Sequence, residues 1–134
     1  MSMKVFSWKI TYVNVEPSSL IGSVLDIRIP VTFYSKEGRG FERLCHVDTK
    51  SDITIVPSAF AKRLGYITGI RAIANGSRGY MTLMKIKIAE KVMSTPVFCE
   101  YGGREYIVGV KTLQEFSRIE IDVKNMEIRL YYIT

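Results

Sequence analysis

The chain has 134 residues, of which 47% are hydrophobic and 24% are charged, and its formal net charge is +6. This length and apolar content predict one folded domain with a single core and exclude an intrinsically disordered chain. No apolar run approaches the roughly 18 residues of a membrane span, and the alternating start of the chain is not a signal peptide, so we expect a cytoplasmic protein without membrane association.

Apolar residues recur with period two along most of the chain, which is typical of half-buried strands. We predict a strand over Val5–Val13 and a second over Val24–Tyr34, followed by a glycine-rich turn at residues 35–40. The strand after this turn, Phe41–Val47, runs directly into Asp48. The first predicted hairpin therefore delivers an acidic residue at its end.

A short helix and a second hairpin follow. Ser58 is placed to cap the helix, and Gly65 is placed to end it. Strand-like stretches then flank Asn75-Gly76, which is the strongest short signal for a hairpin. We expect Ser77 and Gly79 to lengthen the tip of this hairpin and to make it mobile.

The remaining elements are predicted by the same turn and periodicity signals. They are a strand over 95–101, a turn at 102–103, a strand over 104–110, a short helix over 111–116, and a hairpin over 118–133 with its turn at 124–125. The chain is therefore predicted to be mostly β with two short helices, arranged as a small closed or sandwiched sheet.

The cysteines and the histidine do not form a metal site. Cys45 and Cys99 lie far apart, neither has a second Cys or a His at metal-ligand spacing, and His46 is the only histidine. We therefore predict no metal, and we interpret both cysteines as buried thiols in strands. A disulfide is the alternative, which a reducing cytosol disfavours.

The basic residues are scattered over several predicted strands. Lys85 and Lys87, for example, alternate with apolar residues and indicate the solvated face of one strand. Nucleic-acid binding requires a clustered basic patch, so we expect no nucleic-acid partner, although a small basic nucleic-acid binder is a third hypothesis. A single glutamine and three asparagines beside abundant Lys, Arg and Glu favour a thermophile.

Four features whose residues could take part in chemistry follow one another along the chain. They are Asp48-Thr49 at the end of a strand, Ser51 and Asp52 directly after it, the Asn75-Gly76 hairpin, and Ile107-Val108-Gly109 before a helix with Leu113. Each feature alone is a weak signal, whereas the ordered set is moderately specific.

This ordered set resembles the retropepsin-like aspartic proteases, the family of the retroviral proteases. Their signature is an apolar strand, then Asp-Thr-Gly-Ala-Asp, a flap hairpin, and later a hydrophobic-hydrophobic-Gly run before a helix. Lys50 stands where that motif has glycine. The resemblance covers residues 24–132 and leaves residues 1–23 outside it as an N-terminal extension.

The resemblance implies a fold and an activity. The fold would be mostly β, a small closed β-barrel of the acid-protease type with one or two short helices, formed by residues 1–134 as a single domain. One chain carries one Asp-Thr element, so a pair of catalytic carboxylates requires a homodimer in which each copy supplies Asp48. The chain would then be an aspartic endopeptidase that acts on an extended peptide or protein substrate, with no cofactor.

The chemistry of such a pair follows from its electrostatics. Two carboxylates within about 3 Å cannot both ionise, so they share one proton. The ionised member can take a proton from water, and the protonated member can donate a hydrogen bond to the peptide carbonyl.

The resemblance also implies roles for residues around Asp48. Thr49 would hydrogen-bond across the twofold axis, and Gly109 would permit close approach of the active-site loop. Lys50 and Ser51 would complete that loop. Asp52 would accept backbone N–H groups of the substrate, and a flap tip would close over the peptide; the residues of that tip are Asn75, Gly76 and Ser77.

The residues by themselves leave simpler interpretations open. Asp48 is also an ordinary strand-end acid in many proteins, because Asp side chains satisfy local backbone groups. Lys50 and Asp52 project to the same side of an extended chain, where a surface ion pair contributes about 0 to 1 kcal/mol. Asn75-Gly76 is equally compatible with a plain connection between strands.

Lys50 motivates an alternative function. An ammonium about 6 Å from the carboxylate pair, at an effective dielectric near 20, favours the ionised form by roughly 3 kcal/mol. That would remove the shared proton at neutral pH, unless the side chain points to solvent. The alternative is therefore a catalytically inactive retropepsin-like module for dimerisation or peptide binding.

Overall fold

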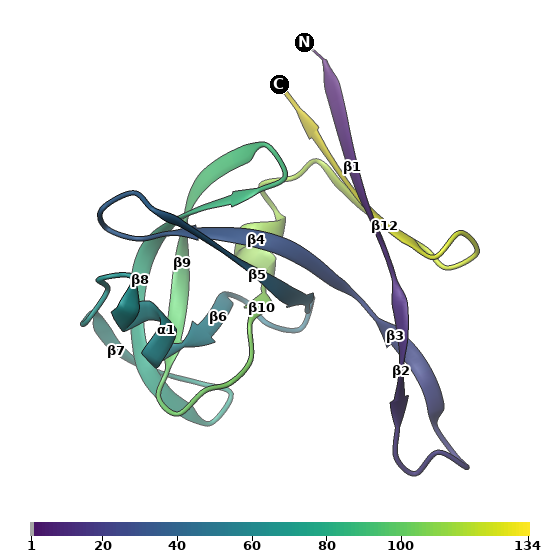
Figure 1. Ribbon diagram of the computed structural model, residues 1–134, viewed down its shortest axis with the longest axis horizontal. Coiled ribbons are helices and arrows are strands. Elements are labelled where there is room, and N and C mark those ends of the chain that lie inside the picture. Colours follow the sequence, from purple (N-terminus) through teal and green to yellow (C-terminus); the bar gives the residue numbers. More distant parts are fainter. Residues whose placement is uncertain (1) are drawn as a thin grey trace. The chain divides into compact units, whose positions relative to one another are not determined.

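The computed structural model describes residues 2–134, which contain strands β1–β12 and helices α1 and α2 (Figure 1). The chain divides into two compact units, each packed mainly within itself. One unit comprises the chain up to Ile29 together with Glu115–Thr134, and the other comprises Pro30–Gln114. The expectation that residues 1–134 form a single domain stays a prediction.

The first unit holds a three-stranded antiparallel sheet, in the order β1-β12-β11, and a separate two-stranded hairpin, β2-β3. Its strands are β1 (Met3–Lys9), β2 (Thr11–Val15), β3 (Gly22–Asp26), β11 (Arg118–Asp122) and β12 (Glu127–Ile133). The strand predicted over Val5–Val13 is divided at Ile10, because its N–H donates to the carbonyl of Met126 beyond the end of the β1–β12 ladder. The strand predicted over Val24–Tyr34 is likewise divided, at Ile27.

The second unit is built on one sheet in the order β4-β5-β10-β6-β9-β8-β7. Its elements are β4 (Arg28–Tyr34, which begins two residues before the unit), β5 (Gly40–Val47), β6 (Thr54–Pro57), α1 (Ser58–Arg63), β7 (Ile70–Ala74), β8 (Ser77–Ile88), β9 (Lys91–Glu100), β10 (Ile107–Val108) and α2 (Val110–Leu113). An additional pairing of β4 with β8 returns the sheet to its first strand, so the sheet closes on itself. The predicted mostly β fold, a small barrel with two short helices, is confirmed.

Apolar residues that recur at every second position of the sequence lie on the buried side of their strands. In β4, Val31 and Phe33 are fully buried while Thr32 between them is partly exposed. In β8, Met84, Ile86 and Ile88 are buried and alternate with Lys85 and Lys87. β6 is buried along its whole length because it lies between β10 and β9 in the sheet.

Both cysteines are free and buried, as the sequence analysis predicts. Cys45 lies in β5 and Cys99 lies in β9. Burial raises the pKa of each thiol to about 12, so both remain protonated at neutral pH.

Helix α1 begins one residue earlier than the predicted cap requires. Pro57, the last residue of β6, occupies the N-cap position in an extended conformation, and Ser58 is the first helical residue, with no side-chain cap hydrogen bond in the described chain. The capping role predicted for Ser58 is therefore wrong, because the strand runs directly into the helix. Gly65 follows the C-cap residue with φ +96°, which confirms its role in ending the helix.

The Asn75-Gly76 turn is confirmed in detail. The two residues have φ 51° and φ 80°, and Ala74 pairs directly with Ser77 across them. This is a two-residue turn of the kind that suits twisted antiparallel strands. Ser77 and Gly79 lie inside β8, so the prediction that they lengthen the tip is wrong.

The C-terminal part of the second unit departs from the predicted ranges. β9 begins at Lys91, earlier than the strand predicted over 95–101, and it forms a long bent hairpin with β8, drawn in teal and green in Figure 1. α2 is shorter than the helix predicted over 111–116. Among residues 2–134, no helix has the length and apolar character needed to cross a membrane.

Candidate active site

Three strands position Asp48. The two-residue strand β10 lies between β5 and β6, parallel to β5 and antiparallel to β6. Val108 pairs with Val47 at the end of β5, and the N–H of Asp48 donates to the carbonyl of Val108 at 3.1 Å. The strand end that carries the acid is thus fixed by the Ile107-Val108-Gly109 segment.

The side chain of Asp48 is half-buried and partly engaged by its own loop. Its Oδ1 accepts a hydrogen bond from the backbone N–H of Lys50 at 2.9 Å, which is an Asx turn. Its carbonyl accepts the N–H of Ser51 at 3.3 Å. The other carboxylate oxygen, Oδ2, has no hydrogen-bond donor among the described residues and is left for an external partner.

The loop after Asp48 is held by the start of α2. The N–H groups of Val110 and Lys111 donate to the carbonyls of Ser51 and Asp52, at 2.8 and 2.9 Å. These are N–H groups that a helix leaves without partners in its own first turn. Ser51 is buried and closes the loop by donating its hydroxyl to the carbonyl of Ile53 at 2.7 Å.

Gly109 lies at the closest approach of two backbone segments. A Cβ at this position would overlap the carbonyl oxygen of Ile53. The φ of Gly109 is −98°, which any residue adopts, so the requirement for glycine comes from space and not from conformation. A side chain here would push the loop that carries Asp48 away from α2.

A buried chain of threonine hydroxyls is hydrogen-bonded to the backbone at Gly109. Thr112 contacts Thr54 at 2.6 Å and Thr95 at 2.8 Å between hydroxyl oxygens, and the N–H of Gly109 donates to Thr54 at 3.2 Å. All three threonines are buried, so these bonds are shielded from water. They join β6, β9 and α2 around the active-site loop.

A pocket of about 360 Å³ lies between this loop and the β7–β8 hairpin. It is lined by Lys50, Ser51, Asp52, Ile53, Ala72, Ile73, Ala74, Asn75 and Met81. The loop residues contribute charge and the hairpin contributes mainly apolar side chains. The pocket can therefore hold a chain with both apolar side chains and polar backbone groups.

The structure brings four of the predicted site residues into this pocket and leaves the others outside its lining. Lys50, Ser51, Asp52 and Asn75 line it. The predicted residues outside the lining are Asp48, Thr49, Gly76, Ser77 and Gly109. Thr49 is exposed, and Gly109 is buried beneath the loop.

Sequence reasoning missed the apolar lining of the pocket. Ala72 and Ala74 alternate along β7, and Met81 follows on β8. The same period-two pattern that predicts the strands could have identified these residues as one face of the hairpin. Ile53, directly after Asp52, was missed because a single apolar residue in a loop carries no pattern.

Lys50 and Asp52 are both exposed. Within residues 2–134 they form no ion pair with each other, so the simple surface ion pair is not what the structure contains. The described non-glycine residues with positive φ are Asn75, Ala89 and Met126. Lys50 is not one of them, so a lysine occupies this position without left-handed strain.

A metal centre has no counterpart in the described part of the chain. No group of three or more His, Cys, Asp or Glu side chains there is arranged to hold a metal ion.

Comparison with known proteins supports the fold. No protein-family model matches the sequence, and no curated protein is significantly similar to it. Among solved structures, the chain is similar to the crystal structure of a retropepsin-like aspartic protease from Rickettsia conorii, with a TM-score of 0.63 and 14% identity over 98% of this chain and 95% of that chain. At this identity the likeness concerns the fold, and the retropepsin-like fold expected from the order of motifs is confirmed.

Proposed function

We propose that the protein is a homodimeric aspartic endopeptidase in which Asp48 of each copy forms the catalytic pair. The observation that carries this proposal is the way in which Asp48 is held. Its backbone is bonded to β10, its Oδ1 is bonded within the loop, and Oδ2 is left open, in a retropepsin-like fold.

Catalysis requires the two carboxylates to act in different protonation states. When two copies meet about a twofold axis, the acids come close enough to share one proton. The ionised carboxylate then activates a water molecule, and the protonated carboxylate donates a hydrogen bond to the scissile carbonyl. Thr49 follows Asp48 and is exposed, and in the proposed dimer it would bond to the partner loop.

The substrate would be an extended peptide held under the β7–β8 hairpin. Ala72, Ala74 and Met81 line the pocket on the hairpin side and suit apolar side chains. Asp52 lies on the opposite side of the pocket, where its carboxylate can accept N–H groups of the peptide backbone. Asn75 and Gly76 would form the tip of the flap, with Ser77 at the base of its second strand.

A peptide-library assay between pH 3 and 7 tests the proposal. Wild-type protein is expected to cleave, and Asp48→Asn is expected to lose activity while keeping its circular dichroism spectrum. Asp52→Asn serves as a matched acid-to-amide control, and it should raise KM more than it lowers kcat, since Asp52 is assigned to binding. Equal rates for wild type and Asp48→Asn would end the enzyme proposal.

The second candidate is a catalytically inactive module for dimerisation or peptide binding, and Lys50 is the residue that favours it. A lysine in the active-site loop adds a positive charge next to the proposed carboxylate pair. Lys50 lines the pocket beside this pair, and its ordinary φ is the observation that favours the active enzyme instead. New proteolysis in Lys50→Gly, absent from wild type, would support the inactive module, whereas strong wild-type activity would exclude it.

Three further expectations stay predictions. They are a cytoplasmic location, a thermophilic source and the lack of a nucleic-acid partner. Retention of labelled DNA or RNA that falls steeply with salt would contradict the last of these.

A further inference from the structure

We propose that the part of the β7–β8 hairpin that carries Arg71 and Arg78 is a binding site for an extended acidic peptide segment. A pocket of about 660 Å³ lies there, lined by Arg71, Ala72, Ile73, Arg78, Gly79 and Tyr101. None of these six lining residues is acidic. Ala72 and Ile73 also line the pocket beside the loop of Asp48, so the two pockets adjoin, whereas Arg71, Arg78 and Tyr101 line this one and not the other. Binding here does not depend on catalysis.

The two arginines of this site share one face of the hairpin. Arg71 pairs directly with Tyr80, and Ile73 pairs directly with Arg78, so all four project to the same side. Arg71 and Arg78 are thus diagonal neighbours, with Cα atoms about 7 to 8 Å apart. From these positions the two long side chains can bind neighbouring carboxylates of one chain.

Neither arginine is neutralised by the protein itself. Both are exposed, and within the described chain neither guanidinium makes a hydrogen bond or an ion pair. By contrast, Arg129 in the first unit bonds to three acidic residues. The charge of Arg71 and Arg78 is therefore available to an external anion.

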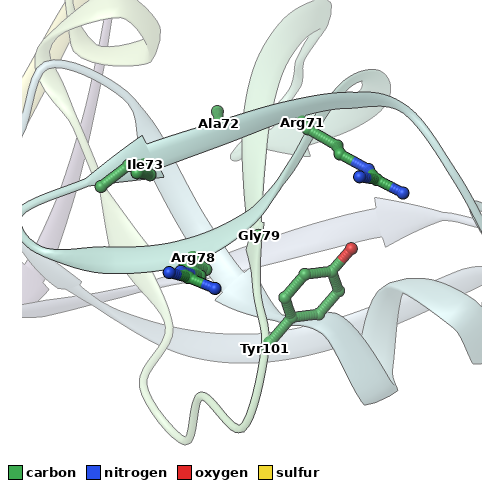
Figure 2. A pocket seen from close by; sticks show the side chains of 6 residues that line it. All are labelled: Arg71, Ala72, Ile73, Arg78, Gly79 and Tyr101. Atoms are coloured by element: carbon green, nitrogen blue, oxygen red, sulfur yellow. The ribbon is translucent and has the colours of Figure 1, made fainter.

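Tyr101 lies beside the two arginines in this pocket. In Figure 2 its side chain extends between those of Arg71 and Arg78, with its hydroxyl on the Arg71 side. The ammonium of Lys62 lies 5.9 Å from the centre of the Tyr101 ring, which adds a third cation near the pocket. The hydroxyl of Tyr101 is a further donor for a carboxylate oxygen.

The geometry of β7 favours an extended peptide as the occupant. β7 is the last strand of the sheet in the described chain, so one of its edges has no strand partner. An extended segment can add to such an edge while its side chains reach the pocket. Ile73 is 71% exposed beside the arginines and suits an apolar residue next to the acids. Single-stranded nucleic acid fits less well, because its binding surfaces combine several stacking aromatic rings with a basic track.

Fluorescence anisotropy with a labelled peptide of alternating Glu and Val tests the site, with the matched Gln–Val peptide as control. The measurement uses the Asp48→Asn protein, so that cleavage does not interfere and failure of the enzyme proposal leaves the binding result intact. The Glu–Val peptide is expected to bind and the Gln–Val peptide is not. Arg71→Gln and Arg78→Gln should each weaken binding about fivefold, and the double variant about 25-fold if the two act independently.

Lys124→Gln provides the charge-matched control, because Lys124 is exposed and belongs to the first unit. It should change the affinity less than about twofold, since a remote surface charge is largely screened. An effect of Lys124→Gln equal to that of the arginine variants would overturn the proposal. So would equal affinity for inorganic phosphate, or tighter binding of a single-stranded oligonucleotide.

Discussion

Gly109 is the residue on which the geometry of the loop that follows Asp48 depends most directly. It lies against the backbone of Ile53, and its φ of −98° requires no glycine. The contact is between two backbone segments, so no side-chain rotation can relieve a clash there.

Replacing Gly109 with alanine should therefore lower the free energy of unfolding by about 3 kcal/mol. Urea denaturation measures the change. Gly38→Ala is the control, because nothing lies within 4 Å of a Cβ there and only its φ of +90° disfavours alanine, at a cost of about 1 kcal/mol. Equal losses in the two variants would mean that the close approach at Gly109 is not rigid.

Among single residues, those that belong to a motif are predicted from the sequence. Those that contribute through buried hydrogen bonds are missed. Gly109 is predicted from the Ile-Val-Gly run, and its lack of space agrees with that expectation. The hydroxyl chain of Thr54, Thr95 and Thr112 is missed, because threonine in a strand looks like any other β-forming residue. Only the fold brings three such distant residues together.

The β7–β8 hairpin is the element whose turn is most tightly specified. Gly76 has φ 80° and Asn75 has φ 51°, and the turn has only these two residues. Glycine adopts this left-handed conformation without strain, whereas for alanine it costs about 1 kcal/mol of conformational free energy.

We expect Gly76→Ala to loosen the hairpin locally. Amide hydrogen exchange of β7 should become about fivefold faster, which corresponds to about 1 kcal/mol of local opening. Asn75→Gly is the control and should leave exchange unchanged, since glycine keeps the required φ. Equal acceleration in both variants would contradict a turn that depends on left-handed residues.

The β11–β12 pair contains a charge network centred on Arg129. Its guanidinium bonds to Glu120, Asp122 and Glu127. The hydrogen bond from Arg129 holds the pKa of Asp122 below its ordinary value of 3.8, at about 2, and the same residue lowers the pKa of Glu120. Depressed carboxylate pKa values stabilise the folded state above the unfolded pKa, and this stabilisation is lost as the pH falls through the folded pKa.

Replacing Arg129 with methionine should therefore destabilise the protein in a pH-dependent way. The difference in unfolding free energy between wild type and Arg129→Met should be full above about pH 5 and shrink as the pH falls to about 2. Urea titrations at several pH values measure it. A difference that stays constant over this range would show that the network contributes packing and not charge.

Elements with strong local signals are the ones that the sequence predicts well. Asn75-Gly76 and Gly65 have the positive φ that their turn and helix-end roles require. Ser58 is misplaced because local capping chemistry does not reveal that β6 continues to Pro57. The breaks at Ile10 and Ile27 are missed because an apolar residue continues the period-two pattern through a bend.

On the scale of the whole molecule, the chain forms two compact units. Composition and length predict one core for residues 1–134, and this expectation can be tested with natural probes. Trp8, the sole tryptophan, lies in β1 of the first unit, whereas Cys45 and Cys99 both lie in the second.

For a single cooperative domain, Trp8 fluorescence and the reactivity of the two thiols should change at the same urea concentration. Burial and the pKa values of about 12 keep both thiols unreactive in the folded state, so labelling reports unfolding of the second unit. Separate midpoints for the two probes would show that the units unfold independently.

The proposed activity depends on assembly, because one chain supplies one Asp48. Mixing wild type with Asp48→Asn, after time for subunits to exchange, separates a shared site from a site within one chain. If both copies contribute an acid, only wild-type pairs are active, and an equal mixture keeps about one quarter of the activity of the same total amount of wild type. Retention of about one half would show that each chain acts alone and would contradict the account.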